Sequence, residues 1–138
     1  MTAKAQGRRA RANGDTAEAL FHAACEAYAV HGMASVFKRP TDYRVVRRLI
    51  KGGFACVPVT AGGCDYAGVM RGGRALLVEV KSSTSARMPI FARAGVAMIK
   101  PQQASQLSEW HDRGALCLVV VKVQDDWWAI HWPEWEKA

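Results

Sequence analysis

Two acidic residues and a lysine stand where two β-rich segments of the sequence would meet. Asp65 begins one of these segments, and Glu79 and Lys81 end the next. Because side chains alternate along a strand, Glu79 and Lys81 point to one face, and the apolar Leu76, Val78 and Val80 point to the other. If the two strands pair through the turn at 71–74, Asp65 comes close to Glu79. The spacing predicts a site with two carboxylates and an ammonium group.

Such a cluster suits the cleavage of phosphodiesters. Neighbouring carboxylates repel and raise each other's pKa unless a positive charge lies between them. Oxygen ligands without a matching His or Cys favour Mg²⁺, or Mn²⁺ in its place, over zinc. The Lys81 ammonium can orient or deprotonate a water molecule and offset charge on a phosphate. Glu-x-Lys is common in strands, however, and the alternative is an exposed charged pair with Asp65 capping a Gly-Gly turn.

One helix is expected before this pair of strands in the sequence, and a second helix after it. Residues 1–13 read as a flexible basic arm, and 14–138 as a single domain. Apolar residues at helical spacing predict a first helix from Asp15 to about Val30, ended by Gly32. Pro101 and Gly114 bound a second helix, and a loop is expected before it.

The remaining segments are predicted strands. Residues 36–60 are β-rich, and about 38–60 are expected to project from the core as a short stalk. The segments 65–70 and 74–81 should form a hairpin. "ALCLVVVKV" is typical of a central strand covered on both faces, and the tail "WWAIHWPEWEKA" of a last strand and a short helix. The fold class is α/β, a central mixed sheet flanked by helices.

Composition favours a nucleic-acid partner. The net charge of +7 and the pI near 9.6 support association with polyanions. No apolar run approaches the ~20 residues of a membrane span, no secretory signal is visible, and a cytoplasmic setting is expected. The four cysteines lack metal-ligand spacing and read as buried, reduced thiols. The tryptophans of the tail could stack on bases, but their crowding more often indicates core or a subunit interface.

Basic residues lie on both sides of the acidic cluster in the sequence. Each alone is more often a solvated surface charge, but together they favour a groove that contacts phosphates without reading bases. The candidate DNA-binding residues are Arg8, Arg9, Arg11, Arg44, Arg47, Arg48, Lys51, Arg87 and Arg93.

The acidic cluster and its surroundings resemble a known family. The order Asp65, then Glu79-Val80-Lys81, looks like the signature of the PD-(D/E)xK nuclease superfamily. More specifically, "CDYAG", "LLVEVKSS", "KPQQASQL" and "RGALCLVVVKV" resemble the RecU-type Holliday-junction resolvases, over residues 14 to 130. The resemblance implies a PD-(D/E)xK nuclease fold, metal ligation by Asp65, Glu79 and the Val80 carbonyl, and a water positioned by Lys81. Cys64, Gln102 and Asp42 depart from the family's usual Thr, His and Pro.

Two further residues are catalytic candidates through the same resemblance. The family often places an acid on the first helix, which here is Glu18, and a glutamine at the start of the second, which here is Gln103. Glu18 also fits a capping box with Asp15, and Gln103 fits an ordinary polar residue of a first turn.

The resemblance implies Mg²⁺-dependent resolution of four-way DNA junctions by paired nicks, in recombination and repair. A homodimer would match the two-fold symmetry of the junction, and the short chain suggests a phage version. Alternatives are a branched-DNA or general endonuclease of the same superfamily, or a DNA-binding protein that has lost the chemistry. A membrane- or RNA-binding protein is disfavoured, because an amphipathic basic helix and RNA-motif aromatics are missing from the sequence.

Overall fold

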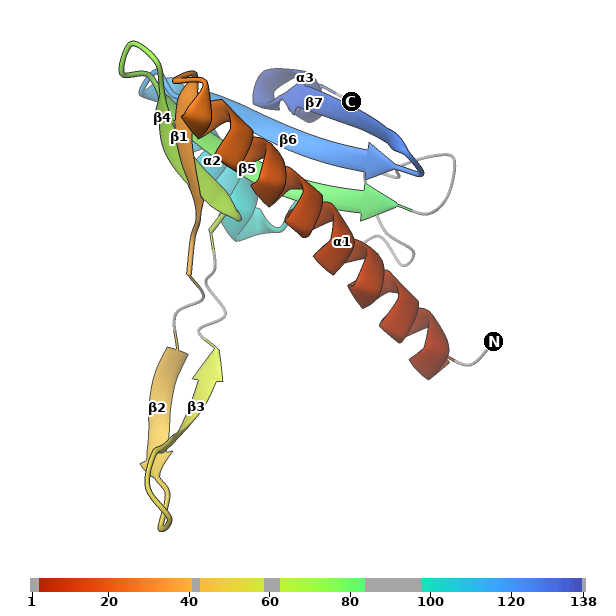
Figure 1. Cartoon of the computed structure of the whole chain (residues 1–138), viewed down its shortest axis with the longest axis vertical. Helices are drawn as coiled ribbons and strands as arrows, with labels where there is room; N and C mark the ends of the chain where they lie inside the picture. The colour runs from red at the N-terminus through yellow and green to blue at the C-terminus, as the bar shows by residue number, and fades with distance from the viewer. Residues whose placement is uncertain (1–2, 41–42, 59–62, 84–97, 138) are drawn as a thin grey trace.

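A mixed five-stranded sheet forms the centre of the computed structural model, which describes residues 3–40, 43–58, 63–83 and 98–137 (Figure 1). The elements in chain order are α1 (Ala3–Val30), β1 (Ala34–Lys38), β2 (Tyr43–Arg48), β3 (Phe54–Pro58), β4 (Tyr66–Met70), β5 (Ala75–Ser83), α2 (Pro101–Asp112), β6 (Leu116–Val123), β7 (Asp126–His131) and α3 (Trp132–Glu136). The strand order of the large sheet is β1-β4-β5-β6-β7, and β2 and β3 form a separate sheet of two strands.

The strand connections explain why the sheet is mixed. β4 and β5 form an antiparallel hairpin, as do β6 and β7, whereas β5 and β6 are parallel. A parallel pair needs a crossover connection, and α2 lies in that connection. The predicted α/β class with a mixed central sheet and flanking helices is confirmed, although β5 rather than β6 is the middle strand.

The sheet has an apolar core on each face. On one face α1 packs over β1 and β5, and Ala17 and Cys25 of the helix contact Leu76, Val78 and Val80 of the sheet. The other face is covered by α2 and α3, whose buried members include Leu107, Trp132 and Trp135. Alternate residues of β5 therefore enter different cores, and Glu79 faces the α2 side together with Leu77.

The first helix is longer than the sequence pattern predicts. Residues 3–13 belong to α1 rather than to a flexible arm, and Asp15 lies inside the helix, so it cannot cap the start. Ala, Arg, Lys and Gln are strong helix formers, so this part can be helical without an apolar face to mark it. Figure 1 shows the N-terminal half of α1 extending beyond the sheet.

The β2–β3 hairpin projects from the core at the place where the stalk is expected (Figure 1). It is inserted between β1 and β4, which are antiparallel neighbours, and the pair of Lys38 with Tyr66 is the last before the insertion. All described side chains of β2 are exposed, and Ile50 at the turn is fully exposed. The hairpin therefore contributes little to the core.

Tight packing explains one glycine of β4. A Cβ at Gly68 would lie 2.1 Å from the backbone oxygen of Ser35 and 2.8 Å from the Cα of Val36, both in β1. Only glycine lets the two strands approach this closely.

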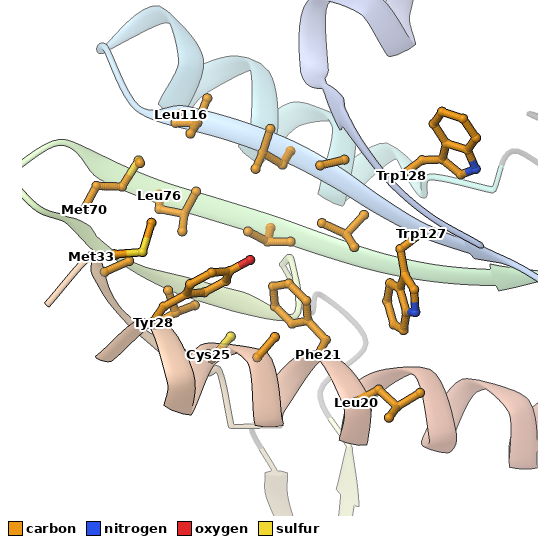
Figure 2. Close-up of a pocket in the computed structure, with 17 residues that line it drawn as sticks. Leu20, Phe21, Cys25, Tyr28, Met33, Met70, Leu76, Leu116, Trp127 and Trp128 are labelled. Atoms are coloured by element: carbon orange, nitrogen blue, oxygen red, sulfur yellow. The ribbon is translucent and has the colours of Figure 1, made fainter. Parts of the chain in front are cut away.

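An apolar trough of about 660 Å³ remains open beside α1 (Figure 2). It lies between the helix and the sheet face of β5, β6 and β7. None of the described residues that line it is charged; the labelled lining includes Leu20, Phe21, Tyr28, Leu116, Trp127 and Trp128. Among the described helices, none is long and apolar enough to span a membrane.

Candidate active site

The β4–β5 hairpin brings the two predicted acids together. Asp65 precedes β4 directly, opposite Glu79 of β5, because the register pairs Tyr66 with Val78. The backbone N of Asp65 donates to Glu79 Oε2 over 3.2 Å, and the backbone N of Val80 donates to Asp65 Oδ2 over 3.0 Å. The two carboxylates therefore share one site at the foot of the projecting hairpin.

Lys81 and Gln103 complete this cluster. Lys81 Nζ lies 2.8 Å from Glu79 Oε1, and Gln103 Nε2 donates to the same oxygen over 2.8 Å. Gln103 lies in the first turn of α2, where its own Oε1 accepts from the backbone N of Lys100. The structure thus brings together four of the five candidate catalytic residues: Asp65, Glu79, Lys81 and Gln103.

Burial dominates the electrostatics of the acids. Glu79 is only 2% exposed, because α2 covers this face of the sheet, so the alternative of an exposed charged pair does not hold for it. That burial, together with the nearby charge of Asp65, raises the pKa of Glu79 to about 7. Burial also raises the pKa of Asp65, and the hydrogen bond from Val80 N opposes the rise. The site therefore carries a carboxyl group that changes its charge near neutral pH.

Glu18 approaches the site from α1, on the other face of the sheet. Its Oε2 lies 2.5 Å from Lys38 Nζ, and its backbone oxygen accepts from the hydroxyl of Tyr66. Its charge also contributes to the raised pKa of Asp65. Since Asp15 does not cap the helix, the capping-box explanation for Glu18 is wrong. A catalytic role for Glu18 stays a prediction.

The donor set suits one kind of cation. Among the described residues, no three His, Cys, Asp or Glu side chains gather as a metal cage. Two carboxylates at one site, with water and substrate oxygens as the remaining ligands, are what Mg²⁺ usually takes from a protein. Burial first, and then the charge of Asp65, raise the pKa of Glu79, and a cation bound between the two carboxylates would counter the second of these causes. These residues therefore fit Mg²⁺, with the Val80 carbonyl beside them as a third candidate ligand.

The candidate DNA-binding residues lie mainly outside the core. Arg44, Arg47, Arg48 and Lys51 are exposed on the β2–β3 hairpin and its turn, and Arg8 is exposed on α1. Arg9 and Arg11 belong to α1, but their side chains lie outside the described part of the structure, as do Arg87 and Arg93 entirely. Two basic elements thus extend from the body that holds the acids (Figure 1).

Sequence reasoning missed two polar residues next to the site. Gln106 of α2 accepts hydrogen bonds from the backbone N of Cys64 and from Nη1 of Arg39. The position of Gln106, three residues after Gln103, was a usable signal, because such residues share one helix face. The sequence offers no signal that sets Arg39 apart from the other basic residues of the predicted stalk.

The tryptophans and cysteines divide between core and surface. Trp132 and Trp135 are buried under the α2 face, whereas Trp127 and Trp128 of β7 are largely exposed. Cys25, Cys64 and Cys117 are buried free thiols, and Cys56 is an exposed one on the hairpin. Burial raises the pKa of the Cys64 thiol, which keeps it neutral beside Asp65.

Comparison with protein families places most of the chain in one of them. A family model described as recombination protein U, or RecU, matches residues 12–136, which include every element from the middle of α1 to α3. No curated protein matches the chain.

Proposed function

The chain belongs to the recombination protein U family, a family of Holliday-junction resolvases, and from this premise we propose that it is a Mg²⁺-dependent endonuclease. It nicks four-way DNA junctions at two matched positions, in recombination and repair. The observation that carries the proposal is the contact of Asp65, Glu79 and Lys81 at one site, with Gln103 bound to Glu79. Mn²⁺ is expected to substitute for Mg²⁺.

The residues divide the work by charge and position. Asp65 and Glu79, with the Val80 carbonyl, would hold the cation, which when bound supplies Lewis-acid activation of phosphate and water. Lys81 is only 18% exposed, so its ammonium acts in a poorly hydrated place, where it orients the attacking water and offsets charge on the phosphate. Gln103 fixes the rotamer of Glu79 through its amide. Glu18 assists by its charge near Asp65.

DNA is held by the basic elements around this site. The hairpin arginines and Lys51 project away from the core, and the N-terminal half of α1 carries Arg8, Arg9 and Arg11. Contacts of these cations with phosphates supply affinity without sequence preference. Arg87 and Arg93, which follow β5 in the chain, complete the proposed set.

A homodimer is the assembly that fits a two-fold symmetric junction. The apolar trough beside α1 supports this choice, because its described lining residues carry no charge on a chain of net charge +7, which makes it unsuited to DNA. Trp128 lines the trough and is 60% exposed, whereas Phe37 is 59% exposed and does not line it. Trp128→Asp should lower the mass measured by light scattering to that of a monomer, and Phe37→Asp should not. A dimer that survives Trp128→Asp would contradict this surface.

Cleavage of matched DNA substrates tests the activity. Four-way junction, flap and linear duplex are incubated side by side with Mg²⁺, with Mn²⁺ and with EDTA. We expect metal-dependent paired nicks in the junction, their loss in Asp65→Asn with binding retained, and normal activity in Asp112→Asn, which alters an exposed acid at the end of α2.

Each other result points to a different function. A preference for flaps would indicate a branched-DNA endonuclease, and equal cutting of all substrates a general one. Junction binding without cleavage under any metal would indicate a protein that has lost the chemistry. The expected phage source and cytoplasmic location stay predictions.

A further inference from the structure

A second glutamine of α2 holds the backbone next to Asp65. Gln106 Oε1 lies 2.9 Å from the backbone N of Cys64 and 2.8 Å from Arg39 Nη1, so one oxygen accepts from both. Arg39 in turn donates its backbone N to the carbonyl oxygen of Asp65 over 2.8 Å. The backbone is thereby held on both sides of the Asp65 Cα, at the amide of Cys64 and at the carbonyl oxygen of Asp65.

This support matters because residues 63–65 lie outside the regular ladder of β4. A strand residue is held by its pairing with the next strand, but the segment before the strand depends on other hydrogen bonds. Besides the bonds of Asp65 to Glu79 and Val80, which are part of the site itself, Gln106 and Arg39 bind the backbone of this segment, and the Cys64 thiol donates to the carbonyl oxygen of Gln103 over 3.8 Å. Gln106 is thus one of the groups that hold the backbone from which the Asp65 carboxylate projects.

Gly63 is shaped for this contact. A Cβ at Gly63 would lie 2.1 Å from Gln106 Oε1 and 2.3 Å from Arg39 Nη1. Both atoms are ends of flexible side chains, so a larger residue would displace them rather than the backbone. Glycine at this position therefore keeps the two side chains in contact with each other and with Cys64.

We propose that Gln106 is a positioning residue for Asp65, held in place by Arg39 and by the space that Gly63 leaves. The inference rests on the proposed nuclease function. It assigns parallel tasks to two glutamines one helical turn apart on α2: Gln103 fixes Glu79, and Gln106 fixes the backbone that carries Asp65. Loss of such an outer partner typically costs 10- to 100-fold in metal affinity or activity.

Three variants of the full chain test the role. Gln106→Ala removes the acceptor, Gln106→Glu keeps an acceptor oxygen for both donors, and Glu109→Ala alters an exposed residue of the same helix as a control. Single-turnover cleavage of a four-way junction is measured over a range of Mg²⁺ concentrations. Hydrogen exchange of the Cys64 amide, followed by NMR, reports the hydrogen bond without any DNA.

For Gln106→Ala we expect cleavage slower by roughly 10- to 100-fold, a higher Mg²⁺ requirement, unchanged junction affinity and faster exchange at Cys64. Gln106→Glu should retain most of the activity and the slow exchange, with its pH profile moved to higher pH by the added negative charge near Asp65. A merely structural role would lower the melting temperature in proportion to the loss of activity and would leave the Mg²⁺ requirement unchanged.

Gly63→Ala supplies an independent check. Alone, it should reproduce the loss caused by Gln106→Ala, because the new methyl group displaces the glutamine. In the double variant the combined loss should be smaller than the product of the two single losses, since Gln106 is already gone and the methyl group can displace only Arg39. Losses that multiply would overturn the proposed contact.

The two possible failures can be told apart. A wrong nuclease assignment silences the wild type and all variants alike, and it leaves no activity for Gln106 to support, so the positioning role falls with it. If the nuclease assignment holds, wild-type cleavage rate and Mg²⁺ requirement in Gln106→Ala would overturn the positioning role alone. Unchanged exchange at Cys64 would do the same.

Discussion

Lys81 Nζ lies 2.8 Å from Oε1 of Glu79, and both side chains leave the same face of β5. Glu79 is buried and Lys81 nearly so, so the ammonium partly compensates a carboxylate that water cannot reach. The compensation is incomplete, because the pKa of Glu79 remains raised to about 7. The chain thus holds a costly acid in its core, and that cost can be measured.

Replacing Glu79 by glutamine should stabilise the chain at alkaline pH. The folded pKa of about 7 lies above the unfolded value of 4.5, so the group favours folding fully below pH 4.5 and loses that contribution as pH rises through 7. In EDTA at pH 8, Glu79→Gln should raise the free energy of unfolding by on the order of 1–3 kcal/mol, with little change at pH 4.5. Urea unfolding at both values measures this; Glu109→Gln is the exposed control. Identical pH profiles for wild type and Glu79→Gln would disprove the buried-acid explanation.

Removing the lysine should separate binding from chemistry. Lys81→Ala should slow single-turnover cleavage of a four-way junction by about 10²- to 10⁴-fold, because the group that orients water and offsets phosphate charge is gone. Junction affinity in EDTA, read by fluorescence anisotropy, should change little. Lys137→Ala removes a lysine that is 72% exposed and far along the chain, and it should cleave normally. Equal rates in the two variants would remove Lys81 from the mechanism.

The role of Glu18 can be read from a pH profile. Its ion pair with Lys38 is half-exposed, so Glu18→Gln should change the free energy of unfolding by no more than about 1 kcal/mol. Its charge raises the pKa of Asp65, however, so the variant should move the acid limb of the cleavage profile to lower pH and slow cleavage about tenfold. Glu26→Gln, an exposed change on the same helix, is the control. If Glu18→Gln cleaves at the wild-type rate with an unchanged pH profile, Glu18 contributes only its ion pair with Lys38.

The hairpin arginines should control the salt dependence of binding. Changing Arg44, Arg47 and Arg48 together to glutamine should lower the slope of log affinity against log salt by about 0.9 for each phosphate that is no longer neutralised. Affinity for junction and duplex is compared between about 50 and 200 mM KCl, because binding that depends on phosphate contacts weakens strongly over this range. Arg113→Gln, which breaks an exposed pair with Glu109, serves as a control. If the triple variant has the same slope as the wild type, the hairpin arginines do not contact DNA phosphates.

A single methyl group on Gly68 should disturb the sheet. The Cβ of alanine would meet the backbone oxygen of Ser35, which cannot move without opening the β1–β4 pair. Gly68→Ala should therefore cost about 1–3 kcal/mol of unfolding free energy. Gly7→Ala, in open space on α1, should instead be neutral or stabilising by up to about 1 kcal/mol. Thermal unfolding followed by circular dichroism compares the two, and equal melting temperatures would be inconsistent with the close approach of the strands.

Local patterns in the sequence were enough to predict the centre of the site. The turn at 71–74 and the alternation along a strand place Asp65 opposite Glu79 and put Lys81 on the same face, and both relations are local in the chain. The start of α1 was not predictable in the same way, because an Ala- and Arg-rich stretch is helical by propensity and shows no apolar period.

The surroundings of the site depend on contacts between distant segments. Arg39 and Gln106 are separated by 67 positions in the sequence and meet only when β1, β4 and α2 are assembled. The burial of Glu79 likewise depends on the crossover helix α2, which covers the acid only once the tertiary structure has formed. The spacing of apolar residues within one segment does not indicate which distant segment it will contact.

The β2–β3 hairpin enters and leaves the core at one point, the pair of Lys38 with Tyr66. Its length can therefore change by whole residue pairs while the sheet, Asp65 and the helices stay where they are. Each added pair would move the tip outward by roughly 3.3 Å, and each deleted pair would draw it back by as much. The hairpin is thus an adjustable spacer, whose reach from the core can be lengthened or shortened independently of the site that holds Asp65 and Glu79.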